Sequence, residues 1–181
     1  NLSPADAARG ARPLRLVSLG TVEPRKNYLA AVKILEALRA AAHPGAELHI
    51  IGRAGWGPDA EKILGQPGVV VHGYLAASEV KRQLECADVY LCTSHDEGLG
   101  LPLLEAQYAG LAVVAPDQAV FREVLGASGT FIDSAKPADA ALTIARLLAA
   151  PDWRAKARAA ALSNIERWNA AAAADMALAQ R

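Results

Sequence analysis

Cysteine is scarce in this chain, which has only Cys86 and Cys92 among its 181 residues. Both stand in apolar surroundings, and they provide neither a disulfide framework nor metal-site spacing. We therefore expect buried, inert thiols in a reducing compartment. Aromatic residues are also few, at 5% of the chain. No apolar run approaches the roughly 20 residues that a membrane span needs, so the sequence predicts no transmembrane segment.

The chain also carries no formal net charge, because 19 basic residues balance 19 acidic ones. This balance gives no reason to expect a nucleic acid or an acidic membrane as partner, although a local basic cluster could still bind phosphate. The dinucleotide fingerprint G-x-G-x-x-G and the phosphate-binding P-loop are absent. No D-x-D pair is present to hold a metal against a diphosphate. We expect no cofactor and no metal ion, so basic side chains would have to neutralise an anionic ligand.

Apolar residues make up 52% of the chain, enough for the core of one large domain. Residues 1–13, rich in Ala, Arg and Pro, are interpreted as a linker, and residues 14–181 as the domain. The chain begins with Asn1 rather than methionine, so we expect it to be a piece of a longer protein.

Strand and helix signals alternate along the domain. Short apolar runs, most of which end at a glycine or proline, predict strands over 14–19, 47–51, 69–72, 88–92, 111–115 and 129–132. Helical spacing predicts helices over 28–42, 59–64, 78–86, 101–109, 121–125 and 138–150, and a last one from 151 to about 168 with a helical tail. Strands separated by helices indicate a parallel sheet. We predict an α/β fold with a doubly wound, six-stranded parallel sheet in the order 3-2-1-4-5-6 and helices on both faces.

Ligands of such sheets bind at the carboxyl ends of the strands, where the strand order reverses. Here the reversal lies between the first and fourth predicted strands. The loop after the first strand carries Arg25 and Lys26, and the loop after the fourth carries Glu97 and two glycines. The topology therefore predicts that the two cations lie opposite a glycine loop, where a diphosphate would fit.

The segment Glu97–Glu105 combines two carboxylates with a glycine loop and a helix start. Gly98 and Gly100 allow the backbone to approach a ligand, and the N-terminus of the following helix carries a partial positive charge. Glu105 is expected one turn into that helix, where its carboxylate could accept hydrogen bonds from a sugar diol. Recognition of an anion and of a polyol in one segment suggests a nucleotide-sugar site.

Several of these segments together resemble a known family, the retaining GT-B glycosyltransferases of the large family four, also called glycosyl transferases group 1. The resemblance is to their C-terminal, donor-binding domain and covers about residues 14–150. Its motifs are Gly20-x4-Arg25-Lys26-Asn27, Leu48-His49-Ile50-Ile51-Gly52, Val71-His72-Gly73-Tyr74, Ala87-Asp88-Val89 and Glu97-Gly98-Leu99-Gly100-Leu101-Pro102-Leu103-Leu104-Glu105-Ala106 followed by Gly110.

The resemblance implies a role for each matching residue. Arg25 and Lys26 would bind the donor diphosphate and stabilise it as it leaves, so they count with Glu97 as the catalytic residues. Glu105 would bind the ribose hydroxyls. The donor's sugar and phosphate would contact Glu97 and the backbone of residues 98–100. The nucleobase would lie along the turn formed by Gly73 and Tyr74. The implied donor-binding residues are Gly20, Gly73, Tyr74, Gly98, Leu99, Gly100, Leu101 and Glu105.

The resemblance also implies a metal-independent reaction that retains the anomeric configuration, in carbohydrate biosynthesis. The donor would be a nucleotide diphosphate sugar, and an N-terminal domain of the same protein, not contained in this chain, would bind the acceptor. We expect a cytoplasmic protein, which would contact the inner membrane through that other domain. The isolated chain should transfer little or nothing. The alternative is a non-enzymatic module that senses nucleotide sugars or scaffolds a partner; a more distant one is a GT-B epimerase.

Other residues admit a simpler interpretation. His95 and Asp96 could suggest a metal or an acid–base pair, but hydrogen bonding within the loop is favoured because no second ligand cluster supports them. His49 and His72 are interpreted as isolated packing residues of strands. Further expectations are helix caps at Asn27 and Ser78 and C-terminal anchors at Trp153 and Trp168. For Trp56 we expect either surface packing or contact with the donor or the other domain.

Overall fold

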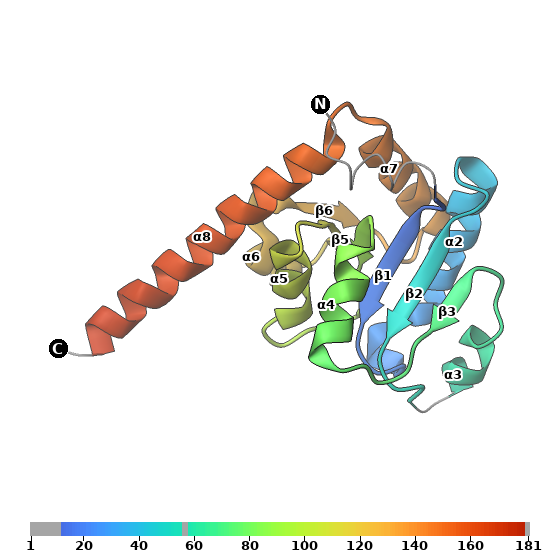
Figure 1. The fold of residues 1–181 in the computed structure, drawn as a ribbon, viewed down its shortest axis with the longest axis horizontal. Helices are drawn as coiled ribbons and strands as arrows, with labels where there is room; N and C mark the ends of the chain where they lie inside the picture. The colour runs from blue at the N-terminus through green and yellow to red at the C-terminus, as the bar shows by residue number, and fades with distance from the viewer. Residues whose placement is uncertain (1–11, 56–57, 180–181) are drawn as a thin grey trace.

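Over the described residues, 12–55 and 58–179, six strands form one sheet in the order β3-β2-β1-β4-β5-β6 in the computed structural model (Figure 1). The strands are β1 Arg15–Leu19, β2 Glu47–Ile51, β3 Val69–Val71, β4 Val89–Leu91, β5 Ala112–Pro116 and β6 Gly129–Ile132. Neighbouring strands are parallel, with Val17 of β1 in register with His49 of β2 and Tyr90 of β4. The predicted doubly wound order is confirmed.

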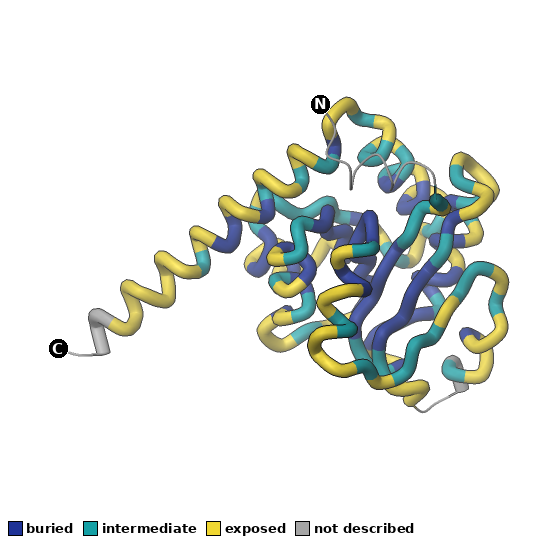
Figure 2. Tube along the Cα trace, viewed as in Figure 1, coloured by how far each residue is buried: buried dark blue, intermediate teal, exposed yellow. Residues whose placement is uncertain are grey.

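Helices pack on both faces of this sheet. They are α2 Tyr28–Ala41, α3 Pro58–Ile63, α4 Ala77–Glu85, α5 Leu101–Tyr108, α6 Ala119–Leu125, α7 Pro137–Ala149 and α8 Trp153–Ala179, with short 3-10 helices η1 Pro24–Lys26 and η2 Gly126–Ser128. Side chains of α2, α3 and α7 share one buried cluster with the sheet, and those of α4, α5 and α6 share another. Alternate residues of a strand point to opposite faces, so Leu16 joins the first cluster and Val17 the second. The central strands are consequently buried on both sides (Figure 2).

Helix α8 connects the two layers and then leaves them. Trp153 at its start packs into the α2–α7 cluster. Further along, Asn164 is buried and the indole N–H of Trp168 donates to the Val124 carbonyl at 2.9 Å, so both tryptophans anchor the helix as predicted. Residues 170–176 are exposed, and Figures 1 and 2 show this half projecting from the body. Even α8, the longest helix in the described ranges, is not apolar enough to cross a membrane, and neither is any other helix there.

Two predicted helix caps are not made. Helix α4 begins at Ala77, with Ala76 at the N-cap position, because the backbone N–H groups of Glu79 and Val80 both bond to the Ala76 carbonyl. Ser78 therefore lies inside the first turn. Asn27 does occupy the N-cap position of α2, but its side chain makes no capping bond within the described chain. Its backbone closes η1 in the left-handed region (φ 51°), whereas a capping side chain needs an extended backbone.

Candidate functional site

The loops that follow β1 and β4 meet at the carboxyl edge of the sheet, as the strand order predicts. The backbone N–H of His95 donates to the Arg25 carbonyl at 2.8 Å. The Thr93 hydroxyl lies 3.1 Å from the carbonyl of Lys26 and 3.0 Å from that of Asn27. Backbone and side-chain bonds thus join η1 to the loop after β4, and this junction places the charged side chains of the site.

Glu97 stands between the two cations of η1. Its Oε1 accepts from Lys26 Nζ at 2.6 Å, and its Oε2 accepts from Arg25 Nη1 at 3.0 Å. The Ser94 hydroxyl donates to the same Oε1 at 2.7 Å. The Arg25 guanidinium also bonds to the Glu23 carboxylate at 2.8 Å and to the Asp96 carbonyl at 2.9 Å. Residues from two loops far apart in the chain therefore form one network of charges.

These contacts shift the titration of the network. Burial by itself would raise the pKa of Glu97, but hydrogen bonds from Lys26 and Ser94 and the charge of Lys26 outweigh it, so the pKa is lowered. Burial tends to lower the pKa of Arg25, yet its bonds to Glu97 and Glu23 raise it on balance. At neutral pH the Glu97 carboxylate and the Arg25 guanidinium are therefore both ionised.

Lys26 reaches Glu97 over a glycine. A Cβ added to Gly20 would lie 2.6 Å from Lys26 Cε, and Gly20 has a φ of 133°, which other residues rarely adopt. On its other side, a Cβ at Gly52 would collide with the Gly20 carbonyl. The Gly52 N–H donates to the Gly73 carbonyl at 3.0 Å. Gly20, Gly52 and Gly73 therefore form a row of bare backbone along the ends of three strands.

Tyr74 continues this row beyond β3. Its side chain is 78% exposed, and the Arg53 guanidinium carbon lies 5.8 Å from its ring centroid. Gly73 has a φ of 72°, and no described atom lies within 4 Å of a Cβ added there. The turn presents an exposed ring, and a glycine with open space where a side chain would lie, at the same sheet edge as Arg25 and Lys26.

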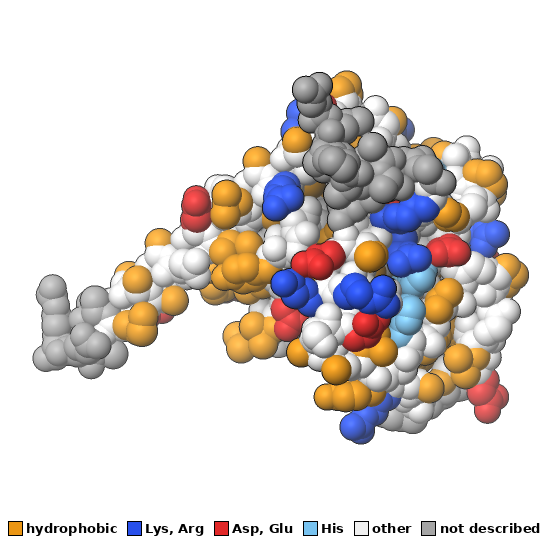
Figure 3. All heavy atoms as spheres, in the orientation of Figure 1, with side chains coloured by type: hydrophobic (Ala, Val, Ile, Leu, Met, Phe, Trp, Pro, Cys, Tyr) orange, Lys and Arg blue, Asp and Glu red, His pale blue; other side chains and the backbone are white. Residues whose placement is uncertain are grey.

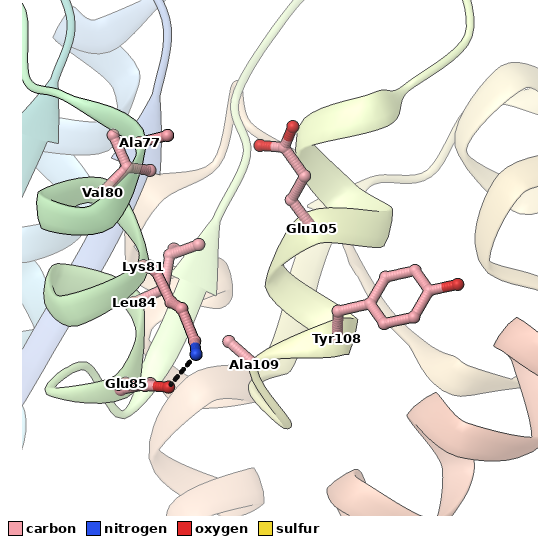
Figure 4. A pocket seen from close by; sticks show the side chains of 8 residues that line it. All are labelled: Ala77, Val80, Lys81, Leu84, Glu85, Glu105, Tyr108 and Ala109. Carbon is pink, nitrogen blue, oxygen red and sulfur yellow. Dashed lines mark ion pairs between the residues drawn. The ribbon is translucent and has the colours of Figure 1, made fainter.

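Glu105 lies on the other side of the glycine loop, in the second turn of α5. Helix α5 starts at Leu101 after Gly100, which is left-handed at φ 61°, and Pro102 stands in its first turn, as predicted. Glu105 lines a groove of about 520 Å³ between α4 and α5 (Figure 4). The other lining residues are Ala77, Val80, Lys81, Leu84, Glu85, Tyr108 and Ala109. Figure 4 shows the Glu105 carboxylate at one end of the groove and the Lys81–Glu85 ion pair farther along.

The predicted site residues thus fall into one contact cluster and two flanks. Arg25, Lys26 and Glu97 touch, and Gly20 lies against Lys26. Tyr74 and Glu105 flank this cluster without a described bond to it. Leu99 and Leu101 are exposed, at 76% and 57%, beside Gly98, which is also exposed. His95 and Asp96 serve in loop hydrogen bonding, since the Asp96 carboxylate accepts from the Glu97 N–H at 2.9 Å. Trp56 and residues 1–11 of the predicted linker lie outside the described residues.

Thr93 and Ser94 were missed as parts of the site. Thr93 fixes the backbone of η1, and Ser94 holds the Glu97 carboxylate in place. Both are almost fully buried, at 2% and 3% exposure. Two hydroxyl residues directly after a buried apolar strand were the available signal, because a buried hydroxyl needs a partner.

The interpretation of His49 and His72 as isolated residues is wrong. His49 Nδ1 lies 2.8 Å from His72 Nε2, and His49 Nε2 lies 3.0 Å from a carboxylate oxygen of Glu47. The two rings stack at 5.1 Å between centroids. Parallel pairing of β2 with β3 sets His49 opposite Val70, so His72 falls on the same face. Figure 3 shows histidine side chains at this surface among basic and acidic ones.

Metal ligands do not gather in the described part of the chain, where no three His, Cys, Asp or Glu side chains are placed to hold an ion. Cys92 is buried, Cys86 is half-buried, and both are free thiols. Burial raises the pKa of Cys92, so its thiol stays protonated at neutral pH.

Comparison with known proteins identifies the class. The family model "Glycosyl transferases group 1" matches residues 4–164, and the chain belongs to this family of glycosyltransferases. Residues of the chain are 27% identical to the O-antigen chain mannosyltransferase B of Escherichia coli over 156 residues, which cover 83% of this chain and 41% of that protein. The D-inositol 3-phosphate glycosyltransferase of Frankia alni is 36% identical over 86 residues, which cover 46% of this chain and 21% of that protein.

Among solved structures, the fold resembles that of Staphylococcus aureus TarM, a point mutant of which was crystallised with fondaparinux, alpha-GlcNAc-glycerol and UDP. The TM-score is 0.69 at 22% identity, over 86% of this chain and 34% of TarM. This likeness confirms the GT-B Rossmann-like fold. The chain spans less than half the length of these relatives.

Proposed function

We propose that this chain is the donor-binding part of a retaining glycosyltransferase, which transfers a sugar from a nucleotide diphosphate sugar to an acceptor held by another domain. The observation that carries the proposal is the contact of Arg25 and Lys26 with Glu97 across the switch point of the sheet. Membership of glycosyl transferases group 1 and the fold shared with UDP-bound TarM support it.

The roles follow from where the residues lie. Arg25 and Lys26 would take the two phosphates by charge-assisted hydrogen bonds and stabilise the charge that develops as the diphosphate leaves. The backbone of residues 98–100 and the N-terminus of α5 would add donors. Since basic side chains and backbone supply this stabilisation, the proposed reaction needs no metal ion. The chain's share of catalysis is then positioning and electrostatics.

The flanks would bind the rest of the donor. Glu105 has an exposed carboxylate at the end of the α4–α5 groove, where it could accept from both ribose hydroxyls. Gly73 and Tyr74 would line the nucleobase with open backbone and an exposed ring. Glu97 and the neighbouring backbone would contact the sugar. The acceptor would enter from the domain that faces this edge of the sheet.

The proposal is tested by thermal-shift measurements with UDP, GDP, ADP and their common sugars. One of these nucleotides should raise the melting temperature, and Arg25→Ala or Glu105→Ala should remove much of the rise, because each charge-assisted contact is worth about 1.5–3 kcal/mol. Matched controls are Arg82→Ala and Glu36→Ala, which remove exposed charges on α4 and α2. Absence of any shift at millimolar nucleotide would refute the proposal.

A further inference from the structure

Glu97 bonds to the same two cations to which the proposed function assigns a diphosphate. Its two carboxylate oxygens are divided between the two cations, Oε1 on Lys26 and Oε2 on Arg25. Two anionic oxygens bound to two neighbouring cations is also the pattern that adjacent phosphates would make. One set of donors cannot serve both anions fully at once.

Burial makes this competition strict for Lys26. Its side chain is 9% exposed and that of Glu97 is 10% exposed, so the ammonium group and the carboxylate meet largely out of contact with solvent. The stem of Lys26 lies against Gly20, which fixes its direction. Arg25 is more open, at 45% exposure. A phosphate can approach Arg25 from solvent, whereas contact with Lys26 requires the carboxylate to move.

The charge balance of the cluster points the same way. Arg25 and Lys26 are opposed by the carboxylates of Glu23 and Glu97, so their charges cancel in the free protein. A dianionic ligand gains a net positive site only when one of these carboxylates withdraws. Glu97 can withdraw, because it is followed by Gly98, which is exposed and around which no described atom would meet an added Cβ within 4 Å.

We propose that Glu97 is an internal counter-anion of Lys26 and Arg25 that is displaced from Lys26 by the incoming diphosphate. This inference rests on the proposed function and adds a step to it. Binding is an exchange of one anion for another, and the carboxylate released from the cations becomes available to the donor's sugar. Glu97 therefore lowers the affinity for the diphosphate in the free protein, although it lies within the site.

The test compares binding of inorganic pyrophosphate, UDP and GDP to the 181-residue chain by isothermal titration calorimetry. Glu97→Gln removes the competing charge and should tighten pyrophosphate binding about tenfold, the equivalent of one charge-assisted contact. Glu23→Gln is the matched control. It deletes a carboxylate that bonds to the exposed side of Arg25, where water screens its charge, and leaves the buried Lys26–Glu97 pair, so it should tighten binding less than about twofold.

A second variant changes no charge and guards against misfolding of the first. Ser94→Ala removes the hydroxyl that holds Glu97 Oε1, which should release the carboxylate more easily and tighten pyrophosphate binding about threefold. Circular dichroism would confirm that each variant is folded.

Pyrophosphate binding to Glu97→Gln and Ser94→Ala that is equal to or weaker than that of the unaltered chain overturns the inference. Equal tightening by Glu23→Gln also overturns it, because the effect would then be one of general charge. Binding of UDP or GDP in these cases leaves the proposed function standing. Tighter pyrophosphate binding without any binding of nucleoside diphosphates supports the counter-anion and refutes the nucleotide site. Failure of every variant to bind any of these ligands overturns both.

Discussion

Lys26 Nζ lies 2.6 Å from Glu97 Oε1, although the two residues are 71 positions apart in the chain. The contact joins the loop after β1 to the loop after β4, the two neighbours at which the strand order reverses. The same pair therefore has two roles. It holds two loops together, which is the structural part, and it fixes an ammonium group at the sheet edge, which is the chemical part.

The structural part can be measured by removing the ammonium group. Lys26→Met keeps the length of the stem but leaves Glu97 with Arg25 and Ser94 alone, and should lower the free energy of unfolding by about 1–3 kcal/mol. Urea titration followed by circular dichroism gives the value. Lys33→Met, an exposed change on α2, is the control and should cost less than about 0.5 kcal/mol. Equal effects of the two changes would mean that the pair adds nothing to stability.

The His49–His72 pair predicts a loss of stability on mild acidification. Burial lowers the pKa of both rings, and the charge of Arg15 lowers it further, although the hydrogen bond that His49 donates to Glu47 opposes the shift of His49. The unfolded chain then binds protons that the folded chain does not, so the contribution to stability is complete above the ordinary histidine pKa of about 6.5 and is lost as the pH falls below it.

Urea midpoints at about pH 7.5 and about pH 5.5, on either side of that pKa, would show the drop. His72→Leu removes one of the two rings and should reduce the drop, while His43→Leu, after the end of α2, is the matched control and should not reduce it. A drop that His72→Leu leaves unchanged would place its origin elsewhere.

Gly20→Ala should impair both stability and binding. The added Cβ would meet Lys26 Cε, and the φ of 133° is strained for alanine, so a cost of about 1–3 kcal/mol is expected. Displacement of Lys26 should also weaken binding of pyrophosphate or UDP in calorimetry. Gly65→Ala separates the two effects, because Gly65 also has a positive φ (81°) but no described atom lies within 4 Å of its added Cβ. It should lower the melting temperature and leave binding intact. A Gly20→Ala variant with normal affinity would show that crowding does not reach Lys26.

Asp88, at the amino end of β4, should matter for stability but not for ligands. Its buried carboxylate accepts from the guanidinium groups of Arg12 at 3.0 Å and Arg154 at 2.9 Å. It also accepts from the backbone N–H of Arg15 at 2.9 Å. Asp88→Asn should therefore lower the free energy of unfolding by about 2–3 kcal/mol.

The control for this change is Asp117→Asn, which breaks an exposed pair with Arg122 and should lower the stability far less, because water screens the pair. Nucleotide affinity should not change in Asp88→Asn, because the residue lies at the opposite edge of the sheet from Arg25. Weaker binding together with normal stability would contradict this assignment.

The backbone of the fold could be predicted because its signals are local. Runs such as Leu48–Ile51 are apolar almost throughout, which marks strands that are buried on both faces. The alternation of strands and helices then limits the topology to very few choices. The meeting of Arg25 with Glu97 followed from that topology alone.

Contacts that depend on register or on competing partners could not be predicted in the same way. The His49–His72 pair requires knowing that His49 is opposite Val70. The contact of Glu97 with both cations depends on which of several charged side chains, among them Glu23, bond to the same cation. The N-cap of α4 is Ala76, which uses only its backbone carbonyl. The preference of serine for N-cap positions pointed to Ser78 instead.

The projecting end of α8 has an energetic consequence of its own. Residues 170–176 are all exposed, and a stretch this short cannot nucleate a helix by itself. Its helical state is propagated from the preceding segment of α8, which the hydrogen bonds of Asn164 and Trp168 to the Val124 carbonyl hold against the body. Unwinding it exposes no core, so this end can fray and re-form while the sheet stays intact, as an independent unit of low local stability.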